Sequence, residues 1–357
     1  MFSVMKSSRF LLLFILPLST WTMPLKAAWA SHPSLETVDK ASGSAMPATG
    51  YWLSQASTTG DLHQQALEKY KQGDYQGAIS TYSKAIALNP KDVYAYTVRG
   101  NTYKAINADS KAIADYDKAI ALDPKYVYAY LARGIAHKEI QKNSQALADF
   151  DKAIALNPED AYAYKARGSI HRDLKDTVKA LADFDKAIAL DPKDAYAYNI
   201  RGSLYKDSKD YPKAISDFDQ AIALDSEDVY ALLLRAEIYK DLKDYPKAIA
   251  DYDKVVALAP RDPLPYASRG LIHDTLKDDP KAIADYDKAI ALNPGFSDVY
   301  LLRGLVHARA DNETQAIRDL QTAAEFFQKQ NRTAAYDKTA ELLKKLSSAP
   351  RELVPEP

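Results

Sequence analysis

A twelve-residue segment recurs along this chain at a fixed period. Residues 281–292 read K-A-I-A-D-Y-D-K-A-I-A-L, and residues 111–122 have the same letters. Near copies begin at residues 145, 179, 213 and 247, so that neighbouring copies start at one constant spacing. A helical segment repeated at one period indicates a repeat architecture, in which each unit buries its apolar face only on its neighbours. The 357 residues therefore do not require one large core.

The prolines that follow most copies divide the chain into 34-residue repeats. In repeat five, an apolar stripe at helical spacing contains Tyr198, Gly202 and Tyr205, and a second stripe contains Phe218 and Ala221. Each repeat is therefore predicted to hold two helices joined by a turn, a helix A and a helix B. The eight repeats are 59–92, 93–126, 127–160, 161–194, 195–228, 229–262, 263–296 and 297–330.

This pattern resembles the tetratricopeptide repeat family. The resemblance rests on small residues at the eighth, twentieth and twenty-seventh positions and a proline at the thirty-second, which in repeat two are Gly100, Ala112, Ala119 and Pro124. It implies an all-α, right-handed superhelical solenoid of eight helix–turn–helix repeats. Repeat eight has Gln328 in place of the proline, so its second helix is expected to run on.

The ends of the chain outside the repeats are expected to differ in structure. Residues 331–348 have apolar residues on one face and suit a C-terminal capping helix, which a stack needs to cover its last apolar surface. Residues 349–357 form a short tail. Residues 31–58 are rich in Ser, Thr, Ala, Gly and Pro without a helical period, and they are predicted to form a flexible linker.

Residues 1–30 have the layout of a secretory signal peptide. Lys6 and Arg9 precede a nine-residue apolar run, and the small residues Ala28 and Ala30 suit cleavage before Ser31. The alternative is an uncleaved membrane anchor, which is less favoured because the apolar run is short. The expected location is therefore exported, in the periplasm or secreted.

Charged residues at two positions of the repeat occur together. Seven repeats have an arginine at the seventh position and an aspartate at the twenty-third, whereas repeat one has Gln65 and Thr81 and lacks both. Because buried charges must be paired, the two side chains are predicted to pair within one repeat rather than with the preceding repeat. The alternative is a cationic row that binds a ligand. The predicted pairs are Arg99–Asp115, Arg133–Asp149, Arg167–Asp183, Arg201–Asp217, Arg235–Asp251, Arg269–Asp285 and Arg303–Asp319.

The resemblance also implies where a partner would bind. In this family helix A lines the inner groove of the superhelix, and ligands usually lie there. Repeated tyrosines and charges of both signs suit a protein or an extended peptide, whereas packing between repeats is the alternative. The groove residues expected at the second and twelfth positions are Tyr94, Tyr128, Tyr162, Tyr196, Tyr230, Lys104, Lys138, Arg172, Lys206 and Lys240.

Several other functions are disfavoured. The chain has no cysteine, which excludes disulfides and thiolate sites, and it lacks the common nucleotide, protease and hydrolase motifs. His137 and His171 share a position that holds tyrosine in other repeats, so it is interpreted as a packing site and no metal or cofactor is expected. Without the three basic residues of the signal segment, the chain has 44 basic and 48 acidic residues. This net negative charge argues against nucleic acid as a partner, since phosphate binding requires a basic surface.

The sequence therefore predicts a non-catalytic exported scaffold that binds a protein or extended peptide through its groove. The alternative is a structural or self-associating cell-envelope protein without a discrete ligand. Neither interpretation requires a membrane contact, except through an uncleaved N-terminal anchor.

Overall fold

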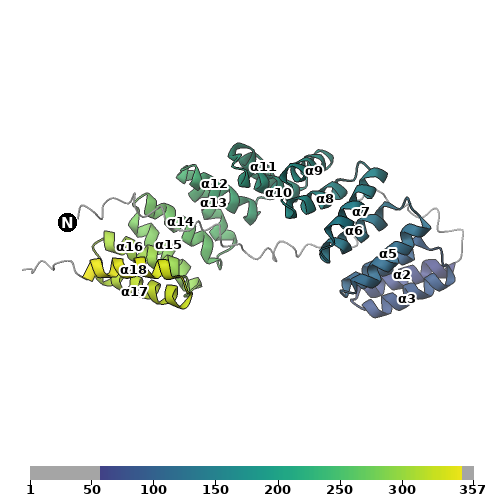
Figure 1. Ribbon diagram of the computed structural model, residues 1–357, viewed down its shortest axis with the longest axis horizontal. Coiled ribbons are helices and arrows are strands. Elements are labelled where there is room, and N and C mark those ends of the chain that lie inside the picture. Colours follow the sequence, from purple (N-terminus) through teal and green to yellow (C-terminus); the bar gives the residue numbers. More distant parts are fainter. Residues whose placement is uncertain (1–56, 348–357) are drawn as a thin grey trace, which may run out of the picture. The chain divides into compact units, whose positions relative to one another are not determined.

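The computed structural model describes residues 57–347, and this part of the chain contains α-helices and no strands (Figure 1). The helices alternate between a helix A and a helix B in each repeat. The A helices are α2 (Ser57–Lys71), α4 (Val93–Ala105), α6 (Val127–Glu139), α8 (Ala161–Asp173), α10 (Ala195–Asp207), α12 (Val229–Asp241), α14 (Pro263–Thr275) and α16 (Ser297–Arg309). The B helices are α3 (Tyr75–Leu88), α5 (Asp109–Leu122), α7 (Asn143–Leu156), α9 (Thr177–Leu190), α11 (Tyr211–Leu224), α13 (Tyr245–Leu258), α15 (Asp279–Leu292) and α17 (Glu313–Lys329), and α18 (Thr333–Ser347) follows them.

The described helices belong to two compact parts of the chain. The N-terminal part (57–208) holds α2 to α10, and the C-terminal part (209–347) holds α11 to α18. Within each part every helix packs on the next one, and α4 on α6, α6 on α8, and α14 on α16 also make contact. The prediction of an all-α solenoid is therefore confirmed. The first helix begins at Ser57, so the predicted linker was wrong for its last two residues.

The predicted signal peptide (1–30), most of the linker and the tail lie outside the described residues. Within residues 57–347, no helix has both the length and the apolar character needed to cross a bilayer.

One residue with a left-handed backbone conformation follows helix A in each repeat. In repeat seven Lys277 has a φ of 64°. The Asp278 N–H donates to the His273 carbonyl at 2.9 Å, and the Lys277 N–H donates to the Asp274 carbonyl at 3.0 Å. These two bonds form a Schellman motif, which satisfies carbonyls that the end of a helix leaves unpaired. Helix B then begins because the Asp278 carboxylate accepts from the Lys281 N–H at 3.4 Å.

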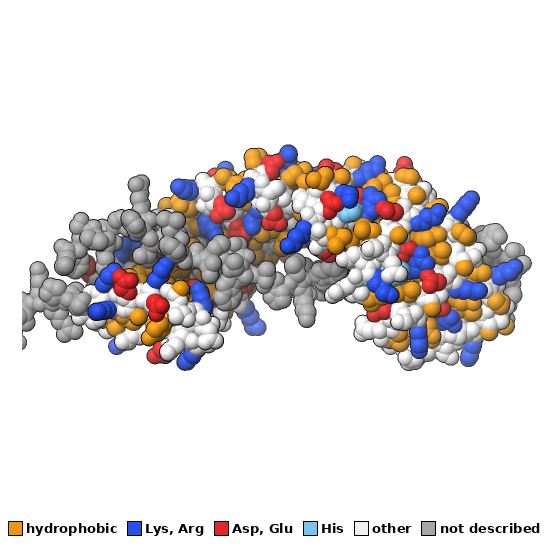
Figure 2. Space-filling view, viewed as in Figure 1, with side chains coloured by type: hydrophobic (Ala, Val, Ile, Leu, Met, Phe, Trp, Pro, Cys, Tyr) orange, Lys and Arg blue, Asp and Glu red, His pale blue; other side chains and the backbone are white. Residues whose placement is uncertain are grey.

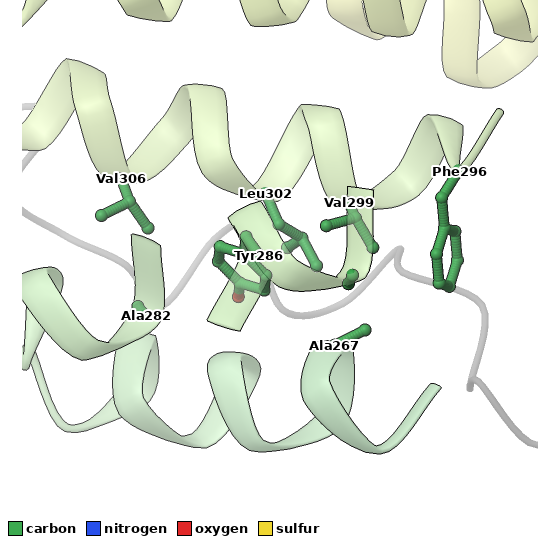
Figure 3. Close-up of a cluster of buried hydrophobic side chains, with 8 residues drawn as sticks. Ala267, Ala282, Tyr286, Phe296, Val299, Leu302 and Val306 are labelled. Atoms are coloured by element: carbon green, nitrogen blue, oxygen red, sulfur yellow. The ribbon is translucent and has the colours of Figure 1, made fainter. Parts of the chain in front are cut away.

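Small residues let the helices approach, and one aromatic side chain fills the space between them. Figure 3 shows Tyr286 of α15 among Ala267 of α14 and Val299, Leu302 and Val306 of α16. Tyr286 is fully buried. This explains why the eighth position is small, because a β-carbon on Gly270 would lie 2.9 Å from Tyr286 Cε1.

The C-terminal end of the stack differs from the repeats inside it. Helix α17 has 17 residues where the other B helices have 14, as expected from the missing proline at Gln328. Helix α18 packs on α17. At the seventh and eighth positions, where A helices inside the stack carry an arginine and a small residue, α18 has the exposed residues Asp337 and Lys338. These charged residues do not suit the packing of a ninth pair, so the stack ends at α18.

Candidate functional site

The arginine at the seventh position joins two repeats. Arg269 Nε donates to Asp285 Oδ2 at 2.9 Å, and its Nη2 donates to Asp285 Oδ1 at 2.6 Å. Its Nη1 donates to Asp253 Oδ1 of the preceding repeat at 2.6 Å. One guanidinium therefore binds the aspartate at position 23 of its own repeat with two donors and the aspartate at position 25 of the repeat before it with a third.

This arrangement recurs, and we call it the Arg–Asp ladder. The structure brings together six of the predicted pairs, Arg99–Asp115, Arg133–Asp149, Arg167–Asp183, Arg235–Asp251, Arg269–Asp285 and Arg303–Asp319. Arg201 belongs to the N-terminal part and Asp217 to the C-terminal part, and the seventh pair stays a prediction. The bonds to the preceding repeat are Arg133–Asp117, Arg167–Asp151, Arg201–Asp185, Arg235–Asp219, Arg269–Asp253 and Arg303–Asp287, and Arg99 bonds to Ser83.

The predicted ionic contacts lie within one repeat and do not include the bond to the preceding repeat. A signal was present. The aspartate at position 25 occurs in repeats two to seven, each of which is followed by a repeat that carries the arginine. Repeat eight has Gln321 at this position, and the next equivalent of the arginine is Asp337.

The ladder is part of the scaffold rather than a free cationic surface. The Asp285 side chain is only 9% exposed, and the hydrogen bond to it raises the pKa of Arg269. The Arg269 guanidinium also lies 5.8 Å from the Tyr266 ring centroid. In repeat six, which has leucine at the place of Tyr266, the guanidinium of Arg235 lies 5.9 Å from Tyr239 instead. Carboxylates and rings thus occupy the guanidinium groups that could have held a ligand.

The histidines at the eleventh position belong to the same network. His137 Nδ1 lies 3.0 Å from Asp149 Oδ2, and both side chains are buried. In repeat one, which has neither ladder residue, the Lys69 ammonium donates to Thr81 at 3.2 Å. The described residues contain no group of three His, Cys, Asp or Glu side chains placed to hold a metal ion.

The tyrosines at the second position differ in how much of the ring is available. Tyr94 has its ring centroid 5.1 Å from that of His63 in the preceding repeat. The Tyr128 hydroxyl accepts from Asn101 Nδ2 at 2.9 Å, again from the preceding repeat. Burial raises the pKa of Tyr162, with smaller effects of Tyr128 and acidic neighbours. These three tyrosines contribute to packing between repeats.

Tyr196 and Tyr230 are the more exposed members of this row, at 39% and 37%. In the N-terminal part, the Lys165 ammonium lies 5.6 Å from both the Tyr162 and Tyr196 ring centroids and donates to Asp194 at 2.5 Å. Tyr196 therefore presents an accessible ring beside a fixed cation. Tyr230 lies in the C-terminal part. The second position of the next two repeats holds Leu264 and Asp298 instead of a tyrosine.

The basic residues at the twelfth position are accompanied by acidic ones at the thirteenth. Lys104 forms an ion pair with Glu139 of the next repeat, and Arg172 bonds to Asp173 at 2.8 Å. Burial lowers the pKa of Lys138, while Asp173 acts in the opposite direction. Lys206 and Lys240 are half-buried on their A helices. The row thus carries charges of both signs, and Figure 2 shows the same mixture of basic and acidic side chains on the face it displays.

Comparison with known proteins decides the family. Models described as "TPR repeat" match residues 66–107 and 100–141, and models described as "Tetratricopeptide repeat" match residues 131–195, 184–216, 201–263 and 276–332. The chain belongs to the tetratricopeptide repeat family. No curated protein matches this chain.

Solved structures with the same architecture are similar to this tetratricopeptide repeat protein. A tetratricopeptide repeat protein from Parabacteroides merdae is 22% identical with a TM-score of 0.50, over 70% of this chain and 99% of that one. PilF from Pseudomonas aeruginosa is 18% identical with a TM-score of 0.50, over 58% of this chain and 95% of that one. MamA is 28% identical with a TM-score of 0.43, over 45% of this chain and 95% of that one. At these identities the first two likenesses concern the fold alone.

Proposed function

We propose that this chain is a non-catalytic exported scaffold that binds a protein or an extended peptide through the exposed side of its A helices. Tetratricopeptide repeats typically serve as protein-interaction scaffolds, and the family therefore supports this class of function. Two of the basic side chains at the twelfth position, Lys104 and Arg172, pair with acidic side chains at the thirteenth position. A partner would accordingly be recognised through aromatic and polar contacts more than through net charge.

The observation that carries the proposal is the exposed ring of Tyr196 beside Lys165. A large aromatic side chain that is 39% exposed presents apolar area together with a hydroxyl, and such residues often anchor interfaces. The cation next to it is held in place by Asp194 at 2.5 Å. Partner contact at this place would use side chains whose positions are already fixed.

A photo-crosslinking amino acid placed at Tyr196 tests the proposal in the native compartment. The matched control is the same amino acid at Ala182, which is exposed on helix α9. We expect a discrete crosslinked species from position 196 and none from position 182. Equal crosslinking from both positions would contradict binding through the A helices. Light scattering measures the oligomeric state and so distinguishes this proposal from the self-associating alternative, because a monomer argues against self-assembly.

Export is a separate part of the proposal. The basic residues, apolar run and small residues before Ser31 support it. The mass of the protein purified from its native host shows whether residues 1–30 have been removed. A chain that begins at Ser31 is expected, whereas a chain that retains residues 1–30 would instead indicate the uncleaved anchor.

A further inference from the structure

Equivalent aspartates begin several A helices of the N-terminal part, and they differ in what lies next to them. Each uses a carboxylate oxygen to cap its helix. Asp92 accepts from the Ala95 N–H at 2.9 Å, Asp160 from the Tyr162 and Ala163 N–H groups, and Asp194 from the Ala197 N–H at 3.2 Å. The three aspartates therefore use Oδ1 in the same way, and they differ in what surrounds the second oxygen, Oδ2.

In two of the three junctions a basic side chain of the preceding A helix reaches Oδ2. His63 Nε2 lies 2.9 Å from Asp92 Oδ2, in a contact without hydrogen-bond geometry. Lys165 Nζ donates a hydrogen bond to Asp194 Oδ2 at 2.5 Å. His63 and Lys165 both occupy the fifth position of their repeats, and the aspartates that they contact occupy the last position. The geometry thus places the fifth-position side chain against the cap of the next A helix.

The junction between repeats three and four lacks this basic group. The fifth-position residue that precedes Asp160 is Leu131, and both residues are only 1% exposed. Asp160 Oδ2 is buried and accepts no hydrogen bond. A buried carboxylate oxygen without a donor is costly when the group is charged, and the cost falls when the group is protonated.

We propose that this junction is a proton-controlled weak point of the N-terminal part, closed when Asp160 is protonated and prone to open when Asp160 is ionised. Opening between α6 and α8 would bring water to Oδ2. It would also separate Tyr128 from Tyr162, which lie on those two helices. The inference does not depend on the proposed partner binding.

The charged groups near Asp160 agree with this assignment. Burial raises the pKa of Asp160, whereas the two backbone hydrogen bonds and Lys165 act in the opposite direction. Lys165 does not replace the missing cation, because its ammonium is bound to Asp194. Glu159 is exposed in the preceding loop, and α6 supplies Leu131 at this place.

The sign of the pH effect follows from the raised pKa. A carboxyl group with a higher pKa in the closed state than in the open state stabilises the closed state at acid pH. That stabilisation is lost as the pH rises through the pKa that Asp160 has in the closed state. One proton is involved, so the opening equilibrium changes by at most about tenfold per pH unit.

Hydrogen exchange of the full-length protein from about pH 4, near the ordinary pKa of an aspartate, to pH 8, followed by mass spectrometry, tests the proposal. The measured quantity is the protection of the first amides of α8 divided by that of the first amides of α10, which have the same cap with its cation. We expect this ratio to fall by up to about tenfold per pH unit while Asp160 ionises. A constant ratio would overturn the proposal.

Three variants locate the effect. Asp160→Asn removes the charge and retains a capping oxygen, so the ratio should become independent of pH. Leu131→Lys should do the same by supplying the cation found at position 165. Lys165→Leu should transfer the pH dependence to α10. If Asp160→Asn retains the wild-type pH dependence, another group is responsible and the proposal is wrong, even if Leu131→Lys fails to fold.

Discussion

Arg269 donates a hydrogen bond of 2.6 Å to Asp253, which lies in the preceding repeat. The same guanidinium binds Asp285 of its own repeat through two further donors. Contacts between neighbouring repeats in this chain therefore include an ionic component in addition to apolar packing. The two aspartates differ in burial, and this difference allows their contributions to be separated.

Replacing Asp285 by alanine should be far more damaging than replacing Asp253. The Asp285 side chain is 9% exposed, so Asp285→Ala leaves Arg269 without its buried partner and should cost about 3 kcal/mol. The Asp253 side chain is 56% exposed, and Asp253→Ala should cost about 0.5 kcal/mol. Urea denaturation of both variants measures the difference.

A double-mutant cycle provides the control for this prediction. Replacing Arg269 and Asp285 together by apolar residues should cost less than the sum of the two single changes. Additive losses would show that the two side chains do not stabilise each other.

The same glycine-to-alanine change should have opposite effects at two helical positions. A β-carbon on Gly100 would lie 2.6 Å from Tyr116 Cε1, and the hydroxyl of that buried ring is fixed by a 2.8 Å bond to Asn101. Gly100→Ala should therefore destabilise the protein by about 1–3 kcal/mol. Gly60 has no atom within 4 Å of an added β-carbon, so Gly60→Ala should stabilise by up to about 1 kcal/mol. Thermal unfolding followed by circular dichroism would detect both signs, and equal shifts would contradict the packing argument.

His273→Tyr should be tolerated, because Tyr239 occupies the equivalent position of the preceding repeat. Burial lowers the pKa of His273, so its neutral form stabilises the folded state above the unfolded pKa. This contribution is lost as the pH falls through the lower folded value. The variant should match the wild type at pH 8 and lose less stability than the wild type near pH 5.

Unfolding midpoints at the two pH values measure this effect. Addition of Zn²⁺ or EDTA is the companion measurement. Neither should change the midpoint, since the described residues contain no group of three His, Cys, Asp or Glu side chains placed to hold a metal ion. A zinc-dependent increase that His273→Tyr removes would show that the histidine position binds metal after all.

Removal of α18 should destabilise the C-terminal part. This helix covers α17, and the adjoining Arg332 binds the Asp298 carboxylate through bonds of 2.7 and 2.8 Å. A chain that ends at residue 332 would expose the covered face of α17 to water, so we expect a lower unfolding midpoint and aggregation during size-exclusion chromatography. Deletion of residues 348–357 alone is the control and should leave both measurements unchanged.

The sequence predicted the helix pairs, their order and the end of the stack, because packing of each repeat depends on a few local positions. Gly100 and Gly270 stand where a ring of helix B leaves no room for a β-carbon, and this position holds glycine or alanine in every repeat. The partner of Arg269 in its own repeat could be predicted in the same way, because the arginine and the aspartate are present or absent together.

The surface of the A helices was harder to predict. The sequence shows that Tyr162 and Tyr196 occupy equivalent positions, but only the structure shows that the first is partly buried and the second is 39% exposed. Their exposure depends on neighbours at other positions, which change from repeat to repeat. For the same reason the sequence alone does not show that Asp160 lacks a basic neighbour, because the residue that faces it belongs to the preceding A helix.

The Arg–Asp ladder also bears on how such a chain can change its length during evolution. An internal repeat contributes an arginine toward the preceding repeat and an aspartate toward the following one, so duplication or loss of one whole repeat joins matching partners again. An insertion or loss that is not a whole number of repeats would leave an unmatched charge. Only the ends need special residues, and they have them, with Gln65 and Thr81 in the first repeat and Gln321 in the last. Gene duplication in units of one repeat would therefore be electrostatically neutral in the interior of this chain.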